Sequence, residues 1–235
     1  MAGCTSLNAS MSSSTSTSIS VVIPAFNAGK FLADALASVA SQSVPVAEVL
    51  VIDDGSTDDC AAIAEDWGAP VRSVRQPHQG AASARNHGAR LAANELLAFL
   101  DADDVWQPGK LAAQLAVLDG RHADAVAFGF CREFSDPPGR FPVRSGQMAA
   151  PSPSALLVAR STFFRVGPLR EDLPVGEMAE WITRAQRTGV EPLMVEQALF
   201  DRRVHADNLT RRLARPRSAY INLIREQRDA ACQRS

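Results

Sequence analysis

The feature that most constrains the fold is a repeated pairing of short apolar runs with polar clusters. Three runs rich in Val, Ile and Leu lie at residues 19–23, 48–52 and 95–100. Their length and composition are typical of strands buried on both faces. The polar clusters that directly follow them lie at residues 24–27, 53–56 and 101–104. Ligands collect at the carboxyl ends of strands in open α/β sheets, so the three clusters are predicted to converge on one site.

Helical spacing of apolar residues fills the intervals between these runs. Strands that alternate with helices across short connections predict an α/β fold, an open and mostly parallel sheet with flanking helices. Helices are expected at about 28–41, 58–67, 80–93, 108–119, 161–166 and 177–188. Further strands are expected at about 71–74, 125–130, 155–158, 192–196 and 199–204, and a long loop over 135–153.

Composition divides the 235 residues into a tail, a domain and a terminal helix. Residues 1–18 are rich in Ser and Thr and are expected to be disordered. Residues 19–210 are predicted to form one domain, with a Rossmann-like half over 19–120 and a second half over 121–210. Residues 211–235 are predicted to form a basic helix, for which a solvated face is the first interpretation.

Charge and cysteine use exclude several classes of protein. The net charge of −2 argues against a general nucleic-acid-binding surface. The four cysteines form no CxxC pair, which argues against a structural zinc or a disulfide framework and fits a reducing, cytoplasmic compartment. No apolar run approaches the ~20 residues of a membrane span. The basic C-terminal segment leaves a peripheral contact with the inner membrane face as an alternative.

The cluster at residues 101–104 is a candidate metal site. Asp101 and Asp103 are two residues apart, so an extended backbone would point both side chains the same way and Asp104 the opposite way. Neighbouring carboxylates repel one another unless a cation lies between them. Oxygen ligands suit Mg²⁺ or Mn²⁺, above all where a phosphate completes the coordination. The alternative is a solvated acidic turn.

Arg85 is the second candidate for the site. It lies on a face of small residues in the helix expected at 80–93, and such a face suits close packing against the sheet. A guanidinium in that row would be partly buried and would need an anionic partner. Asp101, Asp103 and a diphosphate are the candidate partners.

Four motifs together resemble the family 2 glycosyltransferases of the GT-A fold. They are VIPAFN at 22–27, VIDDGSTD at 51–58, ARNHG at 84–88 and FLDADD at 99–104. The resemblance covers residues 20–118 and continues more loosely over 176–189 and 202–208. It implies an inverting enzyme that moves a sugar from a nucleotide-diphosphate sugar, usually a UDP-sugar, to an acceptor hydroxyl. It also implies Mn²⁺ or Mg²⁺ as cofactor, a nucleotide-sugar half over 19–120 and an acceptor half over 121–210.

The resemblance assigns roles to residues of this chain. Asp53 would hold a uracil by accepting a hydrogen bond from its imide N–H, and Arg85 would contact the diphosphate. Asp103 would be the direct metal ligand, and His205 would close over the diphosphate. The nucleotide-sugar-binding residues are then Pro24, Ala25, Asn27, Asp53, Arg85, Asp101, Ala102, Trp181 and His205. The metal ligands are then Asp103, Asp101 and His205.

The catalytic base departs from the family pattern. The family commonly uses the Asp of a Glu-Asp pair, and here Glu177 is followed by Met178. A related pattern, Gly-Glu-x-x-Asp-Trp, aligns with residues 176–181 and places Glu180 at its Asp. Both glutamates are therefore candidate bases, with Glu177 preferred, and Trp181 would be an apolar wall for a sugar ring. The alternative is an ion pair of Glu180 with Arg184 beside a buried tryptophan.

The acceptor class stays open between a glycan, a lipid, a peptide and a small molecule. Two alternative functions are a non-catalytic sugar-nucleotide-binding module, reached by loss of the Asp at position 178, and a sugar nucleotidyltransferase. The second has less support, because no Gly-rich triphosphate loop lies near Pro24.

Overall fold

The parallel half of the molecule is built from the predicted apolar runs. In the computed structural model, which describes residues 18–209, four parallel strands lie side by side in the order β3-β2-β1-β4. They are β1 (Ile19–Ala25), β2 (Glu48–Asp53), β3 (Val71–Arg75) and β4 (Leu96–Phe99). The helices that connect them are α1 (Gly29–Ala40), α2 (Cys60–Trp67) and α3 (Ala81–Leu91). The expected N-terminal tail, apart from Ser18, and the expected basic C-terminal helix lie outside the described residues.

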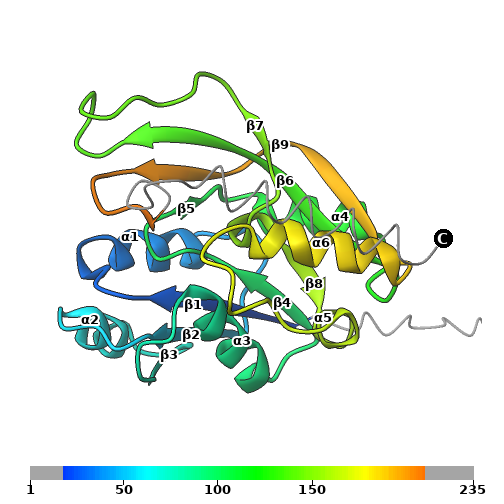
Figure 1. Cartoon of the computed structure of the whole chain (residues 1–235), viewed down its shortest axis with the longest axis horizontal. Helices are drawn as coiled ribbons and strands as arrows, with labels where there is room; N and C mark the ends of the chain where they lie inside the picture. The colour runs from blue at the N-terminus through cyan, green and yellow to red at the C-terminus, as the bar shows by residue number, and fades with distance from the viewer. Residues whose placement is uncertain (1–17, 210–235) are drawn as a thin grey trace, which may run out of the picture.

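The second half extends the same sheet with mixed pairing (Figure 1). Its elements are β5 (Val105–Trp106), α4 (Lys110–Leu118), β6 (Ala125–Ser135), β7 (Met148–Ala150), a 3-10 turn (Pro153–Ala155), β8 (Leu157–Ala159), α5 (Arg160–Val166), α6 (Glu177–Arg187) and β9 (Glu191–Val204). β6 and β9 pair in parallel, whereas β8, β7 and β5 join the sheet antiparallel. The parallel character expected from the sequence therefore holds for β1 to β4 and for β6 with β9.

Three details of the second half differ from the sequence prediction. β9 is one strand where two were expected, because a register shift against β6 falls at its polar residues 196–197. β6 continues five residues beyond the expected end at 130. β5 and β7 were missed, because strands of two and three residues carry no periodicity.

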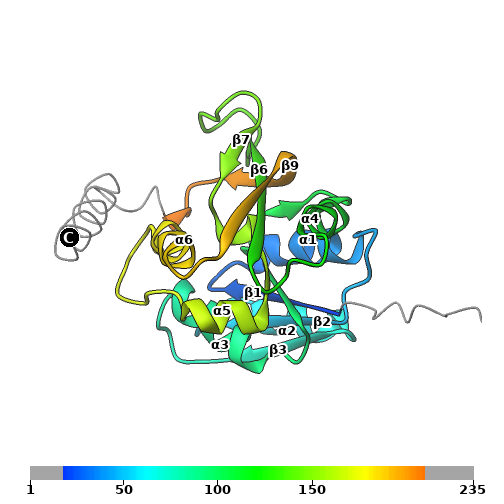
Figure 2. The same cartoon turned by 90° about the vertical axis from the view of Figure 1, so that its right-hand side faces the viewer.

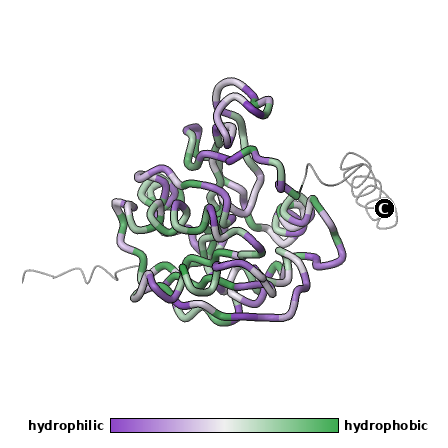
Figure 3. Tube along the Cα trace, turned by 90° about the vertical axis from the view of Figure 1, so that its left-hand side faces the viewer, coloured by the Kyte–Doolittle hydropathy of each residue, from purple (hydrophilic) through white to green (hydrophobic). Residues whose placement is uncertain are grey.

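Helices cover both faces of the sheet. Figure 2 shows α1 and α4 on one side of β6 and β9, with α6 on the other. The hydropathy trace in Figure 3 places hydrophobic segments in the middle of the molecule and many hydrophilic ones in the outer loops. Among residues 18–209, none of the helices combines the length and apolar character that a membrane crossing requires.

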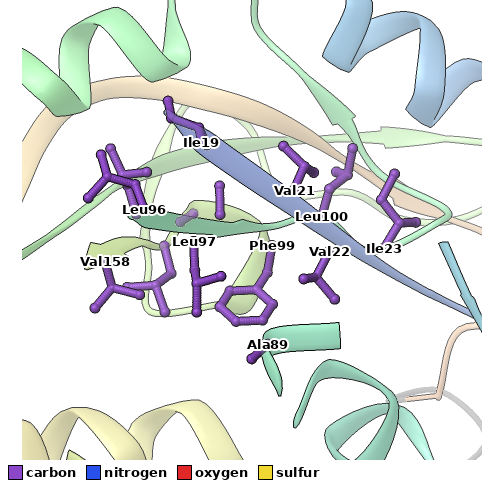
Figure 4. Packing of buried hydrophobic residues seen from close by; sticks show 14 of the residues in the cluster. Ile19, Val21, Val22, Ile23, Ala89, Leu96, Leu97, Phe99, Leu100 and Val158 are labelled. Atoms are coloured by element: carbon purple, nitrogen blue, oxygen red, sulfur yellow. The ribbon is translucent and has the colours of Figure 1, made fainter. Parts of the chain in front are cut away.

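The core centres on β1 and β4, whose side chains are fully buried (Figure 4). α3 packs closely on β1 and on the neighbouring β2 through small residues. A Cβ added to Gly88 would lie 2.3 Å from Cγ1 of Val22, so only glycine permits this approach. The small-residue face predicted for this helix is confirmed, and it brings Arg85 down against the carboxyl edge of the sheet.

Candidate active site

The three polar clusters converge at the carboxyl ends of β1, β2 and β4, as the sequence predicted. The backbone N–H of Asp54 donates to the carbonyl of Ala25 at 2.8 Å, and that of Asn27 donates to Ser56 Oγ at 3.0 Å. The 101–104 cluster joins them through β4, which pairs with β1 up to Phe99. One edge of the sheet therefore carries all three clusters.

Asn27 fastens the first cluster to the second. Its backbone is left-handed, with φ of 51°, a conformation that Asn tolerates better than most residues. Its side-chain oxygen accepts hydrogen bonds from the backbone N–H and the hydroxyl of Thr57 at 2.8 and 3.2 Å. Pro24 and Ala25 are buried within β1, so they shape this edge through the strand backbone.

Asp53 keeps one carboxylate oxygen without a hydrogen bond. Its Oδ1 accepts from the backbone N–H of Ser56 at 2.8 Å, while the buried Oδ2 lies 3.2 Å from a guanidinium nitrogen of the exposed Arg75. A buried acceptor that receives no hydrogen bond is costly, so it favours an incoming N–H donor. A shallow pocket lined by Gly55, Arg75, Gln76 and Pro77 lies beside it.

Asp54 organises the loop that leads into α3. Its carboxylate accepts from the backbone N–H groups of Gln79 and Gly80 at 2.9 and 2.8 Å, and lies 2.8 Å from Nδ1 of His78. The ring of His78 stacks on the half-exposed ring of Phe26, with centroids 4.0 Å apart. Sequence reasoning missed this aromatic pair, because an isolated Phe after a strand gives no signal of its surroundings.

The carboxylates of the third cluster point in different directions. Asp104 is buried and accepts from the hydroxyl of Ser154 at 2.9 Å and from the backbone N–H of Arg203 at 3.2 Å. Burial raises the pKa of Asp104 well above its ordinary value, and the charges of Asp103 and Asp101 act in the same direction. Asp104 therefore lies in the interior, which leaves Asp101 and Asp103 at the site.

Asp103 and His205 come together although 102 residues separate them. The backbone N–H of Asp207 donates to Nδ1 of His205 at 3.2 Å, so in the neutral ring Nε2 carries the proton. That Nε2 lies 2.9 Å from Oδ2 of Asp103, which also accepts from the amide of Asn208 at 3.1 Å. The ring of Phe31 packs against His205, with centroids 4.5 Å apart.

This pair fits a divalent ion that substrate would help to bind. Within residues 18–209 there is no group of three or more His, Cys, Asp or Glu suited to a metal ion. Asp103 Oδ2 and His205 Nε2 lie 2.9 Å apart, close enough to share one ion, but Nε2 can coordinate a metal only in the tautomer with the proton on Nδ1, so a bound ion would replace the hydrogen bond between them. Mg²⁺ is usually held by one or two carboxylates together with substrate phosphates, so two protein ligands suffice.

Arg85 is buried between two carboxylates. Its guanidinium donates to Asp101 at 2.5 Å and to Glu177 at 3.1 Å, while its buried Nε has no hydrogen-bond partner among the described residues. Burial acts to lower the pKa of Arg85, but the charges of Asp101 and Glu177 raise it above its ordinary value. The expected partner Asp101 is confirmed, and Glu177 is a second partner that the sequence did not predict.

The rest of helix α6 has a structural role. Both oxygens of Glu180 accept from Nε of Arg184, at 2.8 and 3.0 Å. Trp181 is fully buried; its indole N–H donates to the carbonyl of Gly167 at 2.8 Å and its ring stacks on Phe163. The prediction that Trp181 forms an apolar wall for a sugar ring is therefore wrong, because this side chain anchors α6 to α5.

Arg203 is a residue of the site that the sequence indicated only as part of a basic strand end. Its Nε donates to the carbonyl of Asp103 at 3.0 Å, and its two terminal nitrogens bind Asp136 at 2.6 Å and Asp34 at 2.7 Å. The guanidinium also lies over the ring of Phe31, 4.7 Å from its centroid. It thereby ties α1 and the end of β6 to the 101–104 turn.

The fold and the site define an α/β protein that gathers carboxylates and basic side chains where its first parallel strands end. The sequence profile described as "Glycosyl transferase family 2" matches residues 20–169, and the chain belongs to this family. The expected fold, an open sheet flanked by helices of the GT-A type, is confirmed by solved structures. TarS of S. aureus in complex with UDP-GlcNAc gives a TM-score of 0.72 over 88% of this chain and 64% of that chain, at 21% identity.

Curated relatives match about half of the chain. The succinoglycan biosynthesis protein ExoU of Rhizobium meliloti is 40% identical over 124 residues, which is 50% of this chain and 36% of that protein. The putative teichuronic acid biosynthesis glycosyltransferase TuaG of Bacillus subtilis is 34% identical over 116 residues, 48% of this chain and 45% of that protein. The matched regions thus span less than half of these relatives.

Proposed function

We propose that this protein is an inverting glycosyltransferase that moves a sugar from a UDP-sugar to an acceptor hydroxyl. The observation that carries this proposal is the grouping of Asp103 with His205, and of Arg85 with Asp101 and Glu177, at the edge where the parallel strands end. One group is suited to a cation with a diphosphate, and the other contains a carboxylate that can take up a proton.

The donor is proposed to bind with its base beside Asp53 and its diphosphate near Asp103. Oδ2 of Asp53 accepts no hydrogen bond and suits the imide N–H of uracil. The exposed side chain of Arg75, 3.2 Å from this oxygen, would have to move away first. Support for a uridine nucleotide also comes from family membership and from the TarS structures, which hold UDP and UDP-GlcNAc. Ala102, buried between Asp101 and Asp103, keeps these two carboxylates at the donor edge.

The donor set of Asp103 and His205 is proposed to hold Mn²⁺ or Mg²⁺, with Asp101 as a further candidate ligand. The ion, when bound, supplies positive charge that stabilises the leaving diphosphate. The protein's own residues hold the ligand in place: Asn208 donates to the carboxylate of Asp103, and Arg203 donates to its backbone carbonyl.

Glu177 is proposed as the general base. The acceptor oxygen attacks C1 of the sugar from the face opposite the diphosphate, the bond from C1 to the phosphate oxygen breaks, and UDP leaves with the electron pair. The acceptor proton passes to Glu177. Glu180 is the weaker candidate, because Arg184 occupies both of its oxygens, whereas only Oε1 of Glu177 is hydrogen-bonded among the described residues.

The acceptor is proposed to approach from the second half of the chain, over the loop between β6 and β7. A cytoplasmic location is proposed as well, with contact at the inner membrane face as the alternative. The free cysteines Cys60 and Cys131 support a reducing compartment.

A thermal-shift screen tests the donor and the metal together. UDP, GDP, UDP-glucose, UDP-galactose and UDP-GlcNAc are added with and without Mn²⁺, and we expect UDP with Mn²⁺ to raise Tm the most. The Asp103→Asn variant should keep the wild-type Tm without ligand, lose the Mn²⁺-dependent shift and nearly lose turnover. Asp66→Asn, at an exposed acid on α2, is the control and should behave as wild type.

Two results would contradict the proposal. Equal Tm shifts for all nucleotides, or no Tm shift for any of them, would contradict the assignment of a uridine nucleotide as donor. Binding of UDP with Mn²⁺ but no release of UDP from any donor would instead favour the sugar-nucleotide-binding module.

A further inference from the structure

The contact between Arg85 and Glu177 joins the donor edge to the candidate base. Arg85 lies on α3 and Glu177 in the first turn of α6, 92 residues later. Both side chains are largely buried, with exposed fractions of 5% and 17%. The same guanidinium also binds Asp101 at 2.5 Å, so a single cation holds one carboxylate at the donor edge and one on α6.

A second contact ties α3 to the segment between α5 and α6. The side-chain amide of Asn86 donates to the carbonyl of Leu169 at 2.8 Å, and its oxygen accepts from the N–H of the same residue at 2.9 Å. This reciprocal pair ties α3 to the segment before α6 without any help from Arg85. The chain that leads into α6 is therefore attached to α3 by a contact that does not involve the ion pair of Arg85, so this attachment should survive substitution of Arg85.

The ion pair of Glu180 with Arg184, on the same helix as Glu177, is a structural pair in which the carboxylate has no free oxygen. Both carboxylate oxygens of Glu180 are occupied, and Arg184 also donates to the carbonyls of Val166 and Pro168 at 2.8 and 2.7 Å. The pair of Arg85 with Glu177 is open by comparison. Oε2 of Glu177 has no hydrogen bond among the described residues, and Nε of Arg85 has no partner.

We infer that Arg85 is a positioning residue for Glu177: it binds Oε1, holds the side chain at the donor edge and leaves Oε2 to accept the proton. This inference rests on the proposed function, since it assigns Glu177 as the base of that reaction. The planar guanidinium suits this task, because its fixed donors reach two carboxylates at once in set directions. A lysine ammonium would keep the charge without that geometry.

A double-mutant cycle on hydrolysis of the UDP-sugar tests the inference, with water in place of the acceptor. The substrate is whichever of UDP-glucose, UDP-galactose and UDP-GlcNAc gives the largest thermal shift. Glu177→Gln should lower kcat by about 10²- to 10⁴-fold, and Arg85→Gln by about 10- to 100-fold. The double variant should match Glu177→Gln in kcat within about threefold, because a positioning residue has no effect once its base is gone.

The Michaelis constant separates this role from a contact with the diphosphate. Arg85→Gln should raise KM for the donor by the same factor in the wild-type and the Glu177→Gln backgrounds. In each of them Asp101 and the donor lose the same guanidinium. If Arg85→Gln does not fold, Arg85→Lys takes its place in the cycle and should show the same loss of the kcat effect in the Glu177→Gln background. Arg121→Gln, which removes an exposed arginine paired with Glu191, is the control and should leave both constants unchanged.

Calorimetry with UDP on the wild-type chain separates failure of the proposed function from failure of the positioning role of Arg85. Absence of UDP binding would overturn the proposed function. Binding of UDP with kcat losses that multiply in the double variant would overturn only the positioning role of Arg85. Binding of UDP without any hydrolysis would overturn it too, because there would be no base to position.

Discussion

At the scale of single residues, the site depends on which oxygens remain free. Asp103, Asp53 and Glu177 each keep an oxygen that internal contacts do not saturate, whereas Asp54 and Asp104 are consumed by hydrogen bonds within the chain. The amino-acid types are the same in both groups. Whether a carboxylate is available to a ligand or holds the fold together therefore depends on its hydrogen-bond partners, and many of these lie far away in the sequence.

The two glutamates of α6 give a direct comparison of these roles. Glu177→Gln should lower turnover by about 10²- to 10⁴-fold with little change in Tm. Glu180→Gln should weaken the pairing with Arg184 and cost about 1 kcal/mol, or roughly 2–4 °C in Tm, with most turnover retained. Steady-state kinetics beside differential scanning calorimetry measures both effects, and the reverse ranking in turnover would move the base to Glu180.

At the scale of elements, strands and helices of the first half could be predicted because each carries its own periodicity. β1, β2 and β4 are short apolar runs, and α3 shows a row of small residues, so the convergence of the polar clusters followed from the fold class alone. The bulge in β9 could not be predicted, since it depends on pairing with β6. The contact of Arg85 with Glu177 depends in the same way on how α6 docks.

Close packing of α3 on β1 provides a test at this scale. Gly88→Ala should destabilise the protein by about 1–3 kcal/mol, because the new methyl group would lie 2.3 Å from Val22 and its neighbours must move. Gly109→Ala, before α4, is the matched control, since nothing lies within 4 Å of its added Cβ. Urea denaturation of both variants measures the difference, and equal stabilities would contradict the packing argument.

At the scale of the whole molecule, the two halves share one sheet but differ in what holds them. The first half is built from consecutive strand–helix units, whereas in the second half β9, the last strand, pairs with both β6 and β5. The interior also contains a fully buried lysine, Lys110, which donates to Gln114 at 2.7 Å and lies over the ring of Trp106. No property of the sequence near Lys110 indicated this burial.

Lys110 predicts a pH dependence of global stability. Burial lowers its pKa well below the ordinary 10.5, so the unfolded chain binds this proton more tightly than the folded protein does. The folded protein is therefore destabilised as the pH falls below about 10.5 and recovers as the pH rises toward it. Relative to Lys110→Met, wild type should gain unfolding free energy between pH 7 and pH 10. Lys30→Met, at an exposed site, should show no such trend against wild type.

The corner formed by Asp103 and His205, which is the proposed cation site, draws its two halves from the middle and the C-terminal end of the described chain. Asp103 follows the fourth strand, whereas Arg203 lies at the end of the last strand and His205 and Asn208 follow it, about a hundred residues on. A fragment that stops before β9 would retain every βα unit of the nucleotide half and still lack this corner. Under the proposed function, tight binding of Mn²⁺ with UDP requires the final strand to be docked, so we expect a truncated or misassembled chain to show no such binding.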